Sequence, residues 1–173
     1  MNKRDLDRCL TDMQAGDNGA FARLYEATVR GLYAFLYAYY ADRADTEDAV
    51  HCVYVKVKTN CLQYRPGTDA RAWMLQIAKN HALNELSRRK RESPLEAAAQ
   101  LRSYDRPLQG TAFDALNTLR DAERETVILH VLWGYKHREI ADMKKIPLGT
   151  VTARYKKAIA KMREYIEKEE GHA

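Results

Sequence analysis

Apolar side chains recur every three or four residues along most of the chain, which is the pattern of amphipathic helices. We predict helices over 6–15, 18–40, 46–60 and 70–91, and then over 113–119, 121–133, 137–144 and 150–167. Residues 50–57 are also rich in β-branched side chains, but their apolar positions fit helical spacing and we predict a helix there. The expected fold class is all-α.

The ends of the predicted helices carry capping signals. Gly16 follows the first helix, and Asp45 is the predicted N-cap of the third, with Glu47 and Asp48 in its first turn. Pro66-Gly67 lies in a predicted loop over 63–69.

Residues 93–110 break the helical pattern. They contain Pro94, Pro107 and Gly110 and little bulky apolar material, so we predict a flexible linker there. The predicted organisation is one small helical domain over 1–92, the linker 93–110, and a second helical domain over 111–173.

Composition excludes several classes of protein. With 173 residues and 46% hydrophobic side chains, the chain can build two small cores. No stretch approaches 18 apolar residues and the first residues lack a signal-peptide core, so we expect neither membrane insertion nor secretion. The three cysteines have no CxxC spacing, which is typical of reduced thiols in a cytoplasmic protein.

Charge is distributed unevenly. Residues 1–50 hold six basic and nine acidic side chains, a net −3, so the remainder carries +8 and the total is +5. Segment 65–91 has seven basic and two acidic residues, and 136–163 has nine and two. Two separate basic segments indicate two contacts with a polyanion; the alternative is two solvated helix faces.

Segments 137–144 and 150–167, joined by the turn 145–149, have the form of a helix-turn-helix. The predicted buried stripe of the second helix is Val151, Tyr155, Ala158, Ile159, Met162 and Ile166. Its other face mixes small, hydroxyl-bearing and cationic side chains, which suits close approach to bases and phosphates in the major groove. An ordinary helical hairpin with a basic surface remains the alternative.

The helix over 70–91 has an unusual polar face of an indole, amides, a hydroxyl and a cation: Trp73, Gln76, Asn80, Asn84, Ser87 and Arg91. Amides pair with adenine edges and an aromatic ring stacks on an exposed base, so this face suits opened or single-stranded DNA. For Trp73 alone, a position in the core is an equal alternative.

No catalytic or metal site is expected. His51 and Cys52 are adjacent and so diverge by about 100° on a helix, and no second cluster completes a tetrahedron. No glycine-rich phosphate loop or nucleophile elbow is present, so we predict neither an enzyme nor a cofactor.

Several stretches in order resemble the extracytoplasmic-function group of bacterial RNA polymerase sigma factors. They are Asp17-Asn18-Gly19-Ala20-Phe21, Asp45-Thr46-Glu47-Asp48-Ala49-Val50, Tyr64-Arg65-Pro66-Gly67, Ala72-Trp73-Met74 and Arg88-Arg89-Lys90-Arg91, then Glu139-Ile140-Ala141 and Ile146-Pro147-Leu148-Gly149-Thr150-Val151. The resemblance covers roughly residues 5–168 and implies that 1–92 is region 2 and 111–173 is region 4.

The resemblance implies three sets of site residues and their partners. Those expected at the −10 element are Tyr64, Arg65, Arg71, Trp73, Gln76, Lys79, Asn80, Asn84 and Arg88. Those expected at the −35 element are Arg138, Gly149, Thr150, Thr152, Ala153, Arg154, Lys156 and Lys157. Those expected to bind core polymerase are Asp45, Glu47, Asp48, His51 and Cys52. The implied partners are the β′ clamp helices and β flap of the polymerase, promoter DNA and, in many members, an anti-sigma factor.

The sequence departs from the family pattern at three places. His51 and Cys52 replace a glutamine and an acidic residue on the surface that binds the core. Lys144-Lys145 replaces Leu-Gly in the turn, so Lys145 is expected to adopt a positive φ at some cost. Thr152, Ala153 and Lys156 lie where promoter selectivity is usually set, so an unusual −35 sequence is expected. A helix-turn-helix regulator that works without polymerase is the alternative function.

Overall fold

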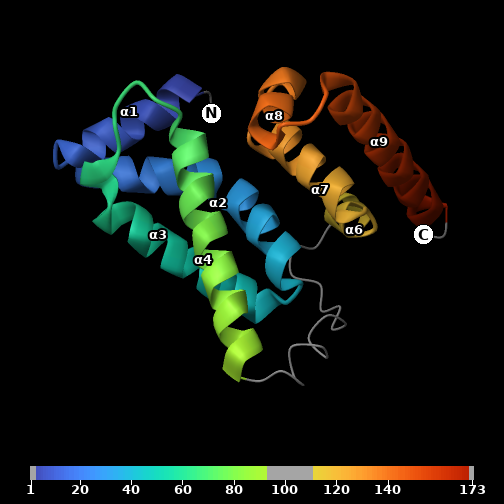
Figure 1. Ribbon diagram of the computed structural model, residues 1–173, viewed down its shortest axis with the longest axis horizontal. Coiled ribbons are helices and arrows are strands. Elements are labelled where there is room, and N and C mark those ends of the chain that lie inside the picture. The colour runs from blue at the N-terminus through green and yellow to red at the C-terminus, as the bar shows by residue number, and fades with distance from the viewer. Residues whose placement is uncertain (1–2, 93–110, 172–173) are drawn as a thin grey trace. The chain divides into compact units, whose positions relative to one another are not determined.

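The computed structural model describes residues 3–92 and 111–171, and the regular structure in those ranges is helical throughout (Figure 1). The described residues fold into two compact units, one over 3–92 and the other over 111–171. The predicted all-α fold with two helical units is thus confirmed. The predicted linker 93–110 lies outside the described residues.

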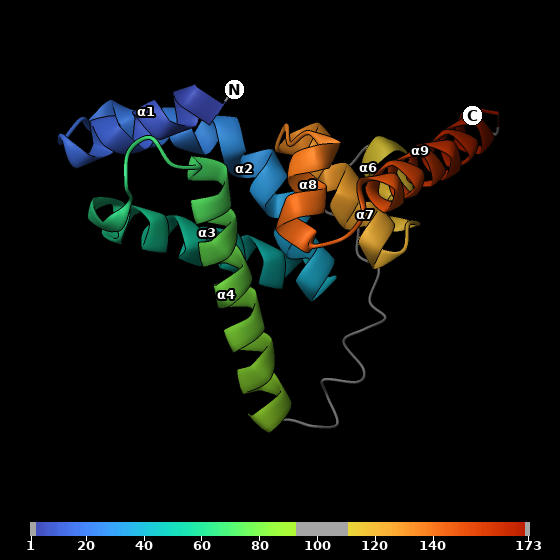
Figure 2. The ribbon, with the colours of Figure 1, turned by 45° about the horizontal axis from the view of Figure 1, so that its top comes forward.

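The first unit is built from four long helices. They are α1 (Lys3–Gln14), α2 (Asn18–Tyr40), α3 (Arg43–Thr59) and α4 (Ala70–Glu92), with a short 3₁₀ turn, η1 (Cys61–Gln63), between the last two. α2 packs against α1 and α3, and α4 crosses both α2 and α3 (Figures 1 and 2). Leu10, Leu24, Leu36 and Met74 are fully buried in the core that results.

The apolar stripe predicted for the third helix is confirmed. All five of its positions are buried: Ala49, Val50, Val53, Tyr54 and Val57. The predicted N-cap was wrong, because α3 begins at Arg43 and Asp42 accepts the capping hydrogen bond from the backbone N of Asp45 at 2.9 Å. This segment is helical despite its β-branched side chains, because a helix buries all five positions against α2 and α4.

The second unit contains α6 (Thr111–Asn117), α7 (Asp121–Val127), a π-helical turn η3 (Ile128–Leu132), α8 (His137–Lys144) and α9 (Leu148–Glu170). α9 packs against α6, α7 and α8. On α9, Val151 and Ala158 are fully buried and the rest of the predicted stripe is half-buried. α9 begins two residues earlier than predicted, with Pro147 as its N-cap.

The turn between α8 and α9 has the predicted positive φ. Lys145 lies in the left-handed region at φ 54° and ψ 44° and ends α8. The backbone N of Ile146 donates to the carbonyl of Ala141 at 3.1 Å, which closes the turn. A lysine therefore occupies a C-cap position that glycine fills with less strain.

We expect Lys145→Gly to stabilise the second unit, because a left-handed backbone costs a residue with a Cβ about 1 kcal/mol or more. The free energy of opening α9, measured by hydrogen exchange in the full chain, should rise by about 0.5–1 kcal/mol. Ala160→Gly, at an exposed position in regular α9, is the control and should lower it by about 1 kcal/mol. No gain at position 145 would show that this turn is unstrained.

Candidate nucleic-acid interface

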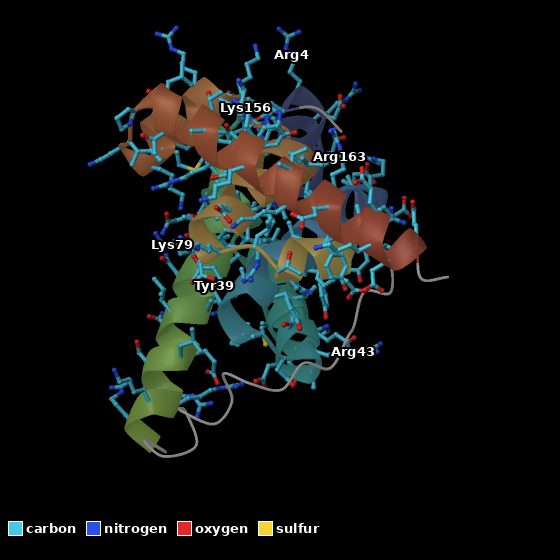
Figure 3. All side chains as sticks on the ribbon, turned by 90° about the vertical axis from the view of Figure 1, so that its right-hand side faces the viewer. Arg4, Tyr39, Arg43, Lys79, Lys156 and Arg163 are labelled. Atoms are coloured by element: carbon cyan, nitrogen blue, oxygen red, sulfur yellow. The ribbon has the colours of Figure 1, made fainter. Side chains whose placement is uncertain are left out.

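One face of α4 presents polar side chains to solvent. Gln76, Lys79, Asn80, Asn84 and Arg88 are all exposed, and Figure 3 labels Lys79 on this helix. The Nε2 of Gln76 donates to the Oδ1 of Asn80 at 2.7 Å, so the two amides form a pair one turn apart. The helix ends in the cationic run Arg88 to Arg91, which places positive charge at its carboxyl end, where the helix dipole favours it.

Trp73 lies at the start of this face and is half-buried. Its ring packs on that of Tyr64, with ring centroids 5.4 Å apart and an angle of 59° between the ring planes. Part of the indole is therefore accessible, while its other side rests on the loop that precedes α4. Packing and base stacking, which sequence could not separate for Trp73, are compatible in this position.

Tyr64 itself is not free to stack on a base, which corrects the sequence prediction. Its side chain is only 3% exposed, and its hydroxyl donates to the Oδ1 of Asp7 at 2.5 Å. Burial, with the hydrogen bond to Asp7, raises the pKa of Tyr64 to about 12. Tyr64 is therefore the loop residue whose side chain packs into the core.

Arg71 is a second correction, because it is buried rather than available to DNA. Its guanidinium pairs with Asp69 at 3.2 Å, and Asp69 also accepts from the backbone N of Arg71 at 3.0 Å. Burial raises the pKa of Asp69, but the hydrogen bonds from Arg71 and Ala72 outweigh it and leave that pKa below its usual value. Of the loop cations, Arg65 is exposed.

The start of α3 carries the side chains predicted to bind core polymerase. Glu47, Asp48, His51 and Cys52 are exposed there. Glu47 also pairs with Arg43 at 2.8 Å on the surface. The exposed surface at this part of α3 is therefore both acidic and polar.

Asp45 differs from the other four residues because it is half-buried and its carboxylate pairs with a side chain of another helix. The guanidinium of Arg89 donates a hydrogen bond to each of its oxygens, and the distance from Nη2 to Oδ1 is 2.8 Å. Arg89 also contacts Glu85 at 3.1 Å, and hydrogen bonds from Arg88, then Arg89, lower the pKa of Glu85 to about 2. Asp45, which was predicted to contact core polymerase, thus joins the start of α3 to the end of α4.

In the second unit, α8 and α9 form a helix-turn-helix. Arg138, Gly149, Ala153, Lys156 and Lys157 are exposed, and Thr150, Thr152 and Arg154 are half-buried. Figure 3 labels Lys156 on α9. The small and hydroxyl-bearing residues cluster in the first turns of α9, and the cations follow within two turns.

A buried carboxylate supports this helix and was missed by sequence reasoning. Glu123 of α7 is only 5% exposed and accepts from the Nζ of Lys161 at 2.7 Å, while Lys157 lies 4.0 Å away. The hydrogen bond from Lys161 lowers the pKa of Glu123 despite its burial. An acid near the start of a short amphipathic helix looks like a dipole-favoured surface residue, so the sequence held no signal for this contact.

Two histidines and a tyrosine form a cluster beside the turn. The ring centroids of His130 and His137 are 4.5 Å apart, and Tyr155 lies 4.8 and 4.9 Å from them. The Nδ1 of His130 is 2.7 Å from the carbonyl of Tyr135. Burial, and then the neighbouring His130, lower the pKa of His137.

Because folding depresses the pKa of His137, it favours the neutral imidazole. The stability that this contributes is present above the usual pKa of 6.5 and is lost as the pH falls through the folded value. We expect the urea midpoint of the full chain to fall between about pH 7 and pH 5, and to fall less in His137→Gln. Equal pH dependence in the two proteins would contradict this assignment.

The described residues hold no group of three or more His, Cys, Asp or Glu side chains that could bind a metal ion. Cys9 and Cys61 are buried thiols and Cys52 is an exposed one. Within residues 3–92 and 111–171, no helix is long and apolar enough to cross a membrane.

Both units match models of one protein family. The Sigma-70 region 2 model matches residues 24–92, and the Sigma-70 region 4 model matches residues 112–162. The chain is 28% identical to the ECF RNA polymerase sigma-E factor of Haemophilus influenzae, over 96% of each chain. It is 26% identical to the ECF RNA polymerase sigma factor SigK of Mycolicibacterium vanbaalenii, over 92% of this chain and 88% of that one.

Solved structures agree in fold. The sigma factor RpoE of Bartonella quintana, solved with the anti-sigma factor NepR, has a TM-score of 0.64 and 20% identity, over 85% of this chain and 96% of that one. CnrH, solved with the cytosolic domain of CnrY, has a TM-score of 0.59 and 21% identity, over 95% and 98%. The two family models, in their order along the chain, and the similarity to ECF sigma factors over nearly the whole length show that the chain belongs to the extracytoplasmic-function group of the sigma-70 family of RNA polymerase sigma factors.

Proposed function

We propose that this sigma factor binds core RNA polymerase in the cytoplasm and directs it to promoters through two separate DNA surfaces. The observation that carries the proposal is the pairing, in one chain, of an exposed amide-rich face on α4 with a helix-turn-helix in the second unit. The first suits an opened strand and the second suits the major groove. We assign the boundaries 1–92, 93–110 and 111–173 to region 2, linker and region 4.

At the −10 element, the reading face consists of Trp73, Gln76, Lys79, Asn80, Asn84 and Arg88, with Arg65 at the loop. Extruding a base costs a few kcal/mol, and one aromatic stack returns about 1–3 kcal/mol. With Tyr64 buried, Trp73 is the aromatic residue that we assign to this stack. The side chains of Lys79 and Arg88 then contact the phosphate backbone of the DNA and hold the strand.

At the −35 element, the first turns of α9 enter the major groove. We assign Thr150, Thr152, Ala153 and Lys156 to base edges, Gly149 to close approach, and Arg138, Arg154 and Lys157 to phosphates. Each well-formed bidentate pair with a base contributes about 1–3 kcal/mol of discrimination. Thr152, Ala153 and Lys156 lie where promoter selectivity is usually set, so we expect an unusual −35 sequence.

Core polymerase docks on the exposed start of α3, through Glu47, Asp48, His51 and Cys52, and contacts the second unit through its β flap. Asp45 contributes to the same surface by holding the helix in place through Arg89. An anti-sigma factor is a further proposed partner. The RpoE and CnrH structures each contain a second protein, and the one bound to RpoE is an anti-sigma factor.

The test is capture of core polymerase by the purified chain, followed by run-off transcription from a pool of genomic promoters. We expect association with core and transcription from a defined subset of promoters. The free chain should bind DNA weakly and with strong salt dependence. Only when both units are tethered to the polymerase does binding of one raise the effective concentration of the other at its DNA site. Tight sequence-specific binding without polymerase would instead support a self-sufficient regulator.

A further inference from the structure

The loop between α3 and α4 is held by the helix α1, which lies outside the residues matched by the region 2 model. In Figures 1 and 2 the loop runs beside α1 before it enters α4. This loop leads directly to Trp73, so its conformation sets how the DNA strand meets the start of α4. Two side chains of α1, Gln14 and Asp7, hydrogen-bond to the loop, and Lys3 of the same helix lies 3.6 Å from Asp69 at its end.

Gln14 holds the first half of the loop. Its Nε2 donates to the carbonyl of Cys61 at 2.8 Å and to the carbonyl of Tyr64 at 2.7 Å. One amide group therefore satisfies two backbone acceptors that lie three residues apart. Because that nitrogen carries two N–H donors, both are used and the amide is held in one orientation.

Asp7 holds the second half of the loop. Its Oδ1 accepts from the hydroxyl of Tyr64 at 2.5 Å and from the backbone N of Gly67 at 2.7 Å. Gly67 has φ +82°, a conformation that residues with a Cβ rarely adopt. The carboxylate thus anchors the loop at a buried ring and at its tightest backbone position.

These anchors leave a short exposed tip. The carbonyl of Arg65 accepts from the backbone N of Thr68 at 3.3 Å and from the Oγ1 of Thr68 at 2.7 Å, which closes a turn over residues 65–68. Arg65, Pro66 and Thr68 face solvent, while Tyr64 is buried beneath them. The tip is therefore preorganised by contacts that reach back to α1.

We propose that Asp7 and Gln14 are positioning residues that hold the loop 61–69 in the conformation that receives the opened −10 strand. The inference rests on the proposed function. A loop that is already ordered loses less conformational entropy on binding than a free one, so the anchors increase affinity for DNA that they do not touch. Neither residue was singled out by the sequence, because the contacts span 47 to 60 positions.

The test uses holoenzyme and fork-junction DNA with a single-stranded −10 element, taken from a promoter identified by the run-off assay. Asp7→Ala and Gln14→Ala should each lower affinity about tenfold. Asp7→Asn keeps an oxygen that accepts both hydrogen bonds and should stay within about twofold of wild type. Asp12→Ala is the matched control, because Asp12 lies on the same helix but pairs with Arg23 at 3.1 Å.

Two further measurements separate positioning from general loss of folding. Affinity for core polymerase and for duplex DNA that carries only the −35 element should be unchanged. Hydrogen exchange of the free chain should quicken in residues 61–69 by about tenfold, with α3 and α4 unaffected. These readouts would all move together if the variants merely unfolded the first unit.

The proposal is overturned if wild-type holoenzyme binds the fork and both alanine variants bind it equally well, or if Asp7→Asn loses as much affinity as Asp7→Ala. It is also overturned if the loss is as large on DNA that carries only the −35 element. A wild-type chain that fails to bind core polymerase would overturn the proposed function itself, which is a different result.

Discussion

Trp73→Ala should lower the occupancy of open promoter complexes by roughly tenfold to a hundredfold in the holoenzyme. The physical reason is the loss of one aromatic stack on an extruded base, worth about 1–3 kcal/mol. The half-buried indole has one side against Tyr64, with centroids 5.4 Å apart, and presents the remainder at the start of the polar face of α4. Permanganate reactivity of the opened strand measures the effect.

Two controls make this result specific. Trp73→Phe keeps an aromatic ring and should recover most of the opening. Occupancy of the −35 element, measured by footprinting on the same complexes, should stay at the wild-type level, because α9 belongs to the other unit. If holoenzyme with Trp73→Ala opened promoters as well as wild type, the role of the indole would be limited to packing on Tyr64.

The elements of this fold follow from local patterns, and so they could be predicted. The five-position stripe of α3 places its residues in the core, although β-branched side chains there favour a strand. The positive φ of Lys145 was also predictable, because the family that the sequence resembles has a glycine at this position of the turn. In both cases the sequence pattern that carries the prediction lies within a few turns of one helix or one loop.

The site was less predictable wherever a distant partner decides the role of a residue. Tyr64 is buried because its hydroxyl reaches Asp7, 57 positions earlier, and Asp45 is paired because Arg89 lies 44 positions later. The spacing of apolar residues along the sequence gives no information about such distant partners. Arg71 differs, since its partner Asp69 is only two residues away, and the missing information was the burial of the arginine itself.

Substitution of the cations on α9 should separate base-reading from phosphate contacts at the −35 element. In the part of the chain that the structure describes, Lys156 is exposed and has no ion-pair partner, whereas Lys157 lies 4.0 Å from the buried carboxylate of Glu123. We expect Lys156→Ala to weaken holoenzyme binding to the −35 element about tenfold. Lys157→Ala should weaken it less, because Glu123 already offsets part of the charge of Lys157.

The salt dependence of binding distinguishes these two lysines from a general loss of positive charge. Each phosphate contact contributes about 0.9 to the slope of log affinity against log salt concentration, so a lysine that binds phosphate lowers that slope by about 1 when removed. A lysine that reads a base lowers affinity in a sequence-dependent way instead, which a set of single-base changes in the −35 element would detect. Lys168→Ala is the matched control, because this lysine lies near the far end of α9 and pairs with Glu164 at 2.7 Å. If Lys168→Ala weakened binding as much as Lys156→Ala, the effect would come from net charge, and α9 would not be inserted in the groove by its first turns.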